Sequence, residues 1–248
     1  MMHESPESTP TRPEDFRTTH WSVVLLAGRD QSPEAHGALE KLCRAYWYPL
    51  YVFVRRQRYE ASEAQDLTQE FFATLLEKNT LQHADPRRGR FRTFLLSSLK
   101  NFLANDWDKK RALKRGGGQP IFSLDDVDVE ARYQLEPAHD LTPEKMFERR
   151  WAETVFERVM RCLREEYAST GKAERFEALK PFLSAEGKPA TYAQVGQVLG
   201  LTENAVRSAL SRLRQRSREL FRHEIAQTVA SPEEIEDEIR YLFAALGD

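Results

Sequence analysis

The sequence is poor in cysteine and has no long apolar run, and each shortage excludes a class of protein. Cys43 and Cys162 lie far apart, with no histidine or second cysteine at ligand spacing, so neither a disulfide framework nor a zinc site is predicted. No segment approaches the roughly 20 apolar residues that cross a bilayer. Residues 1–15 are polar and rich in proline, unlike a signal peptide. We therefore expect a cytoplasmic protein without membrane insertion.

The signatures of an enzyme are missing as well. The histidines are scattered, and neither a cluster of metal-ligating residues nor a nucleophile with a neighbouring base is visible. The glycine run 116–118 lacks the Lys-Ser/Thr that follows in a phosphate-binding loop. We predict no catalytic activity, no metal and no cofactor.

Glycine is scarce, whereas leucine, alanine, glutamate and arginine are abundant, and this composition favours helix. Apolar residues recur at helical spacing over 33–58, 62–78 and 91–113, and no alternation of strand type is long enough to build a sheet. The predicted fold is all-α, with two small helical domains joined by a flexible linker.

The domain boundaries follow from composition, because glycine, proline and acidic residues interrupt the helical periodicity near the middle of the chain. No clear dimerisation element is present, and we expect a monomer when the protein is free. The predicted parts are a disordered leader (1–15), an N-terminal helical domain (16–115), an acidic linker (116–142), a C-terminal helical domain (143–222) and an acidic amphipathic extension (223–248).

The net charge of -2 hides blocks of opposite sign. Between residues 87 and 115 ten basic side chains are opposed only by Asp106 and Asp108, and a second basic stretch runs from 207 to 222. Residues 125–140 and the tail are acidic. The pattern indicates two polyanion-binding surfaces, masked in the free protein by its own acids. Ordinary solvated surface is the alternative.

The sharpest local signal lies in residues 191–215. Thr191 and Gln194 have the spacing of a capping box, which starts a helix. Gly196 is small enough for a second helix to approach closely, and Gly200 suits the left-handed turn that ends the first helix. These positions together predict a helix-turn-helix, for which an ordinary helical hairpin is the alternative.

The second helix of this pair is expected to turn a polar, basic face outward. Such a face fits the major groove, where arginine, asparagine and serine reach base edges and further arginines hold phosphates. This chemistry favours DNA binding over a structural hairpin. The predicted contact residues are Thr202, Glu203, Asn204, Arg207, Ser208, Ser211, Arg212 and Arg214.

With this motif near its end and a basic helix upstream, the chain resembles bacterial sigma factors of the extracytoplasmic-function type over residues 35–115 and 143–222. The resemblance implies a factor that binds core RNA polymerase and directs it to promoter DNA, the C-terminal domain recognising the −35 element. It also implies contacts with the β flap of the polymerase. Whether an anti-sigma factor exists stays open.

Residues 66–72 are similar to the family's D-x-x-Q-E-x-F segment, which docks on the clamp helices of the β′ subunit. The acidic and amide side chains of this segment fit charge-assisted hydrogen bonds to a basic partner. The polymerase-binding residues implied are Asp66, Gln69, Glu70 and Phe72.

Residues 89–95 and the basic helix after them are similar to the family's promoter-melting element for the −10 region. An amide such as that of Asn101 can read the edge of an unstacked base, while basic side chains hold the backbone. Ala84 stands where many relatives have an aromatic residue. The residues implied are Arg92, Lys100, Asn101, Lys109, Lys110, Arg111, Lys114 and Arg115.

The tail has a well-formed helix start at Ser231 and Pro232, followed by an apolar stripe that must be buried. Our hypothesis is that this acidic helix packs on the protein's own domains and tempers access to DNA, simple packing being the alternative. The main rival for the whole chain is a stand-alone helix-turn-helix regulator, whose DNA binding would not depend on polymerase.

Overall fold

The computed structural model describes residues 33–77, 89–112, 129–134, 141–183, 190–226, 228–229 and 231–247. The predicted disordered leader (1–15) and Ala84 lie outside these residues. Within the described ranges every regular element is a helix, which confirms the all-α prediction. The three helices predicted at 33–58, 62–78 and 91–113 are present to within two residues at either end.

The chain order is simple, and the helices differ greatly in length. One short 3₁₀ turn, Lys180–Phe182, directly follows a helix that ends at Leu179, and another, Pro232–Glu234, directly precedes the last helix. The helices are α2 (Pro33–Arg56), α3 (Ala61–Glu77), α4 (Phe91–Ala112), α5 (Val129–Gln134), α6 (Pro143–Ser169), α7 (Ala173–Leu179), α8 (Tyr192–Leu199), α9 (Glu203–Ala226) and α10 (Ile235–Gly247).

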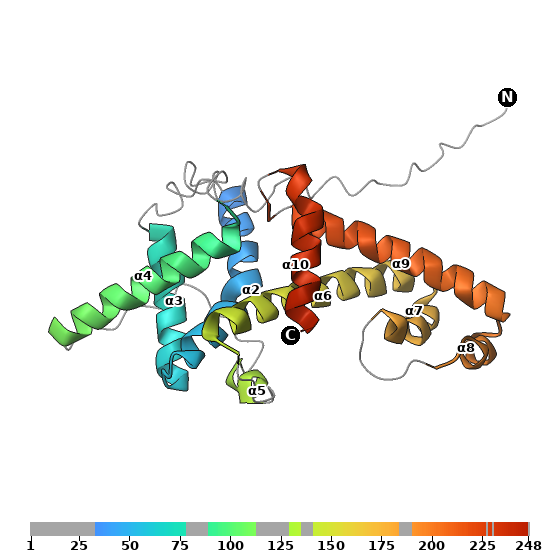
Figure 1. Ribbon diagram of the computed structural model, residues 1–248, viewed down its shortest axis with the longest axis horizontal. Coiled ribbons are helices and arrows are strands. Elements are labelled where there is room, and N and C mark those ends of the chain that lie inside the picture. Colours follow the sequence, from blue (N-terminus) through green and yellow to red (C-terminus); the bar gives the residue numbers. More distant parts are fainter. Residues whose placement is uncertain are drawn as a thin grey trace, which may run out of the picture.

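The 27-residue helix α6 runs through the middle of the molecule (Figure 1). It begins at Thr142, whose hydroxyl accepts the Lys145 amide, with proline at the first helical position. Its first half packs against α2 and its second half against α9, while α10 lies across α6 and α9. The domain boundary expected at residue 143 therefore coincides with the start of α6, which packs against helices from both predicted domains.

Aromatic packing holds α2, α3 and α4 together. Trp47 stacks on Phe72 with ring centroids 5.6 Å apart, and Tyr46 meets Phe91 edge-on at 5.5 Å. All four side chains are buried. Paired rings of this kind add to the free energy gained by burying their area, so α2, α3 and α4 are firmly joined.

A buried arginine joins three helices that lie far apart in the sequence. Arg92, at the start of α4, is 2% exposed and lies over the Trp151 ring of α6, 4.4 Å from its centroid. Its guanidinium pairs with Glu148 of α6 at 2.6 Å and with Glu238 of α10. Burial lowers the pKa of Arg92, and Glu148 opposes that shift. Removing one partner of such a pair costs roughly 3–5 kcal/mol, because the other charge is left buried.

Part of the expected linker is folded, because α5 docks on α2. The Glu130 carboxylate accepts hydrogen bonds from Arg55 Nε at 3.0 Å and Nη2 at 2.8 Å, and from the Tyr51 hydroxyl. Arg132 lies 4.0 Å from the ring centroid of Tyr48. Within 116–142, residues 129–134 are thus an ordered helix rather than a free tether.

We predict that acid releases α5 from α2. Burial raises the pKa of Glu130, but the hydrogen bonds from Arg55 and Tyr51 outweigh burial and hold it below the ordinary value of 4.5. A depressed pKa means that the docking energy is present above pH 4.5 and is lost as the pH falls through the lower, folded-state pKa. Hydrogen exchange of the α5 amides, expressed as protection factors, should show this loss.

In Glu130→Gln the α5 amides should already be poorly protected at neutral pH, with little further change on acidification. Glu177→Gln is the matched control, because that carboxylate is 53% exposed and pairs with Arg164 of α6, away from α5. Full protection of α5 in Glu130→Gln at neutral pH would contradict the prediction.

Candidate nucleic-acid interface

The turn between α8 and α9 has the local geometry that the sequence predicted. The Thr191 amide donates to Gln194 Oε1 at 2.8 Å, and the Gln194 amide donates to Thr191 Oγ1 at 3.3 Å, which completes a capping box. Gly200 ends α8 in the left-handed region, with φ 64° and ψ 32°. Three residues therefore separate two helices whose ends are both fixed by hydrogen bonds.

Gly196 sets how closely α8 approaches the turn. A Cβ atom at this position would lie 2.6 Å from the Leu201 carbonyl oxygen and 3.8 Å from Val206 Cγ2. Thr202 Oγ1 accepts the Ala205 amide at 3.3 Å and so caps α9. Val206 is fully buried against α8, and α9 consequently leaves the turn in one fixed direction.

The eight residues predicted to contact DNA, which are the cap residue Thr202 and seven residues of α9 as far as Arg214, are all exposed. Arg207 lies 3.8 Å from Glu203 and over the Tyr192 ring at 5.5 Å, while Arg214 donates to the Phe182 carbonyl at 3.5 Å. The structure thus brings guanidinium, amide and hydroxyl groups together on one face of the first turns of α9.

In the second half of α9, two of the three arginines pair with acidic side chains of other helices. Arg216 binds both carboxylate oxygens of Glu166 at 2.9 and 2.6 Å, and its pKa is raised chiefly by that hydrogen bond. Arg222 pairs with Glu236 of α10. Within the described residues Arg212 and Arg218 make no ion pair. The basic surface of α9 is therefore concentrated between residues 207 and 218.

The basic residues of α4 are only partly open to solvent. Lys100 is 45% exposed and pairs with Glu144 at 2.7 Å, a contact that holds the pKa of Glu144 low. Asn101 is exposed beside it. The side chains of Lys109, Lys110 and Arg111, in the last turns of α4, and residues Lys114 and Arg115 lie outside what the structure describes.

Arg92 does not fit the DNA-contact role expected of it. It is 2% exposed and its charge is already engaged by Glu148 and Glu238, so no surface is left for a phosphate in this conformation. The sequence could not show this, because both carboxylates come from helices more than 50 residues further along the chain.

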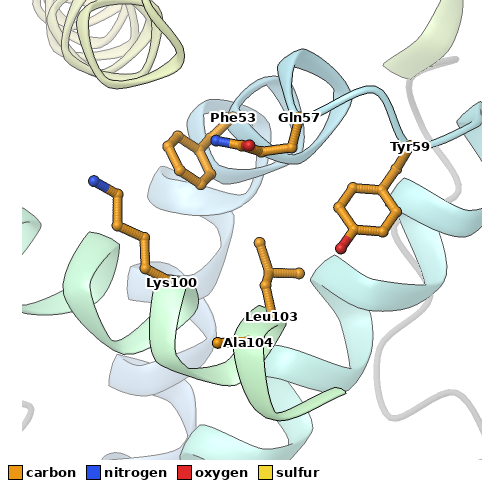
Figure 2. Close-up of a pocket in the computed structure, with 6 residues that line it drawn as sticks. All are labelled: Phe53, Gln57, Tyr59, Lys100, Leu103 and Ala104. Atoms are coloured by element: carbon orange, nitrogen blue, oxygen red, sulfur yellow. The ribbon is translucent and has the colours of Figure 1, made fainter. Parts of the chain in front are cut away.

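An open cavity of about 360 Å³ lies between the end of α2 and the middle of α4. Figure 2 shows Leu103 and Ala104 facing Phe53 and Gln57, with Lys100 at one side and Tyr59 at the other. The partly exposed Tyr59 ring, the Gln57 amide and the Lys100 ammonium group can stack on, hydrogen-bond and neutralise a nucleotide, whereas Phe53 is 1% exposed and has no face open for stacking. The cavity is adjacent in α4 to the exposed Asn101.

The third predicted surface, on α3, is only partly as expected. Asp66 and Glu70 are exposed and Gln69 is half-buried, so all three side chains can reach a partner. Phe72 is 1% exposed and stacks on Trp47, and it cannot supply the polymerase contact expected of it. The reason is helical spacing, because Phe72 lies four residues after the fully buried Thr68 and joins the same inner stripe.

Sequence reasoning missed the carboxylates that face α4. Glu144 and Glu148 are four residues apart on α6, and they pair with Lys100 and Arg92, which are eight apart on α4. The two carboxylates lie on one face of α6 and the two basic residues on one face of α4. This helical spacing is the feature of the sequence that could have predicted the ion pairs.

No protein-family model matches the chain, and no curated protein and no solved structure matches it. Among the described residues, no three histidine, cysteine or acidic side chains are grouped so as to hold a metal ion. None of the described helices is both long and apolar enough to span a bilayer.

We predict that Gly196→Ala destabilises the α8–α9 pair. The added methyl would press on the Leu201 carbonyl oxygen, which is backbone and cannot rotate away, at a cost of about 1–3 kcal/mol in the free energy of unfolding. Gly247→Ala is the control, since nothing lies within 4 Å of its Cβ position. Urea denaturation followed by circular dichroism measures both, and equal stabilities would contradict the prediction.

Proposed function

We propose that this protein is a sigma-type transcription initiation factor that binds core RNA polymerase and directs it to promoters by sequence-specific DNA binding. The observation that carries the proposal is the exposed row from Thr202 to Arg214 on α9, held by the capped α8–α9 turn. A cytoplasmic location follows from the polymerase as partner.

The first turns of α9 have the chemistry of a major-groove recognition helix. Arginine pairs with the two acceptors of guanine and asparagine with adenine, and Arg207 and Asn204 stand one turn apart on the exposed face. Ser208 and Ser211 add hydroxyl groups, and Arg212 supplies a charge for the phosphate backbone. In the proposed assignment this helix recognises the −35 element.

The α4 surface supports the second half of the proposal, recognition of an opened −10 element. Lys100 lines the cavity shown in Figure 2, whose Tyr59 ring and Gln57 amide suit an unstacked base, and the exposed Asn101 is the next residue along α4. A base captured there would have its phosphates next to the basic end of α4. The exposed Asp66 and Glu70 on α3 then remain for the clamp helices of the polymerase.

Run-off transcription with purified core RNA polymerase tests the proposal, using genomic fragments that include the gene's own upstream region. Defined start sites should appear only when the protein is added. Specific DNA binding by the protein alone, together with no association with core polymerase, would instead favour a stand-alone regulator.

We predict that Arg207→Ala weakens promoter binding by about 5- to 150-fold, the equivalent of about 1–3 kcal/mol for one lost base contact, and relaxes specificity at one base pair. Arg164→Ala is the matched control, because that arginine is 54% exposed and pairs with Glu177 away from α9's recognition face. Fluorescence anisotropy on promoter duplexes with single base changes measures both effects. A uniform loss across all sequences would show a phosphate contact instead.

A further inference from the structure

The basic side chains at the start of α4 are occupied by a carboxylate of the C-terminal helix. Arg90 Nε lies 2.7 Å from Glu238 Oε2, and Arg92 pairs with the other oxygen of the same carboxylate. Glu238 is completely buried. A carboxylate held between two guanidinium groups occupies the position and supplies the charge that a backbone phosphate would.

Further contacts fix α10 in this place. The Tyr241 ring lies 5.0 Å from the Arg90 guanidinium carbon and 4.7 Å from that of Arg92. Leu242 is fully buried, and Phe243 packs on Phe221 of α9 with centroids 5.4 Å apart. One short helix thereby ties α4 to α9, the two helices that the proposed function directs to DNA.

In this structure the α4 and α9 surfaces lie closer together than the two promoter elements that the proposed function assigns to them. Lys100 of α4 is anchored at Glu144 and Arg216 of α9 at Glu166, so α6 separates them by 22 residues. The pairs Arg158–Glu224 and Glu166–Arg216 show that α9 runs antiparallel to α6, and nine further residues lead to Arg207. At 1.5 Å per residue the path is about 47 Å. Elements centred 25 base pairs apart, as −10 and −35 imply, are about 85 Å apart.

We propose that α10 is an autoinhibitory latch, in which Glu238 acts as an internal anion on Arg90 and Arg92 and holds α4 and α9 closer than a promoter requires. This inference rests on the proposed function. Nucleic acid competes with Glu238 for the two guanidinium groups, and release of α10 frees Arg90 and lets the two surfaces move apart. The latch thus lowers the fraction of molecules that are competent to bind DNA.

Glu238→Gln in the full-length chain tests the latch, because it removes the charge and keeps the shape of the side chain. Asp237→Asn is the matched control, since that neighbouring carboxylate is 66% exposed and its one ion pair within the described residues is with Arg240 on the same helix. The probe is a duplex with a single-stranded end, at low salt. Glu238→Gln should bind it at least about threefold more tightly than wild type, and Asp237→Asn should bind as wild type does.

Hydrogen exchange of residues 235–247 in the wild-type protein provides a second measurement that does not depend on any variant folding. Saturation with the same DNA should lower the protection of the α10 amides. If these amides stay equally protected and Glu238→Gln binds no more tightly, α10 is packing alone and the latch is overturned. If Glu238→Gln fails to fold, as thermal denaturation would show, the wild-type exchange decides.

The two proposals fail in different ways. DNA binding that releases α10, without start sites when wild type or Glu238→Gln is added to core polymerase, would overturn the sigma assignment and support the latch. Start sites that depend on the protein, with α10 still protected in the DNA complex and no tighter binding by Glu238→Gln, would support the sigma assignment and overturn the latch.

Discussion

The salt-bridged cluster around Arg92 is the contact on which the arrangement of the helices depends. Its guanidinium lies buried between Glu148 of α6 and Glu238 of α10, with Trp151 beneath it. A charge in this position is tolerated only because two carboxylates and an aromatic face replace water around it. Three helices from distant parts of the chain are therefore fixed relative to each other, and with them both candidate DNA surfaces.

The two parts of the candidate interface, the first turns of α9 and the start of α4, differ in how exposed their basic side chains are. The first turns of α9 are fixed by the Thr191 capping box and the close approach at Gly196, while their outer face stays open to solvent. At the start of α4 the opposite holds, since its arginines are bound by the protein's own carboxylates. In the proposed function, the open face of α9 can bind DNA first. The DNA phosphates can then compete with the protein's own carboxylates for the arginines at the start of α4.

The charge blocks of the sequence take on a specific meaning in the fold. The sequence indicated that acids would mask the basic surfaces, and acids do pair with them, but they come mainly from α6 and α10. Of the acidic stretch 125–140, the described Glu130 binds Arg55 of α2 instead. The blocks of opposite charge thus meet in particular ion pairs between helices, each with its own geometry.

Local chemistry along the chain determined the helices, the capped turn at Thr191 and Gly200, and the exposed row on α9, because caps, glycine conformation and helical period involve residues only a few positions apart. The burial of Arg92 and Phe72 depends on partners that the sequence does not reveal, which are Glu238 in α10 and Trp47 in α2. Only the tertiary structure decided those, because burial of a side chain is settled by whichever distant helix packs over it.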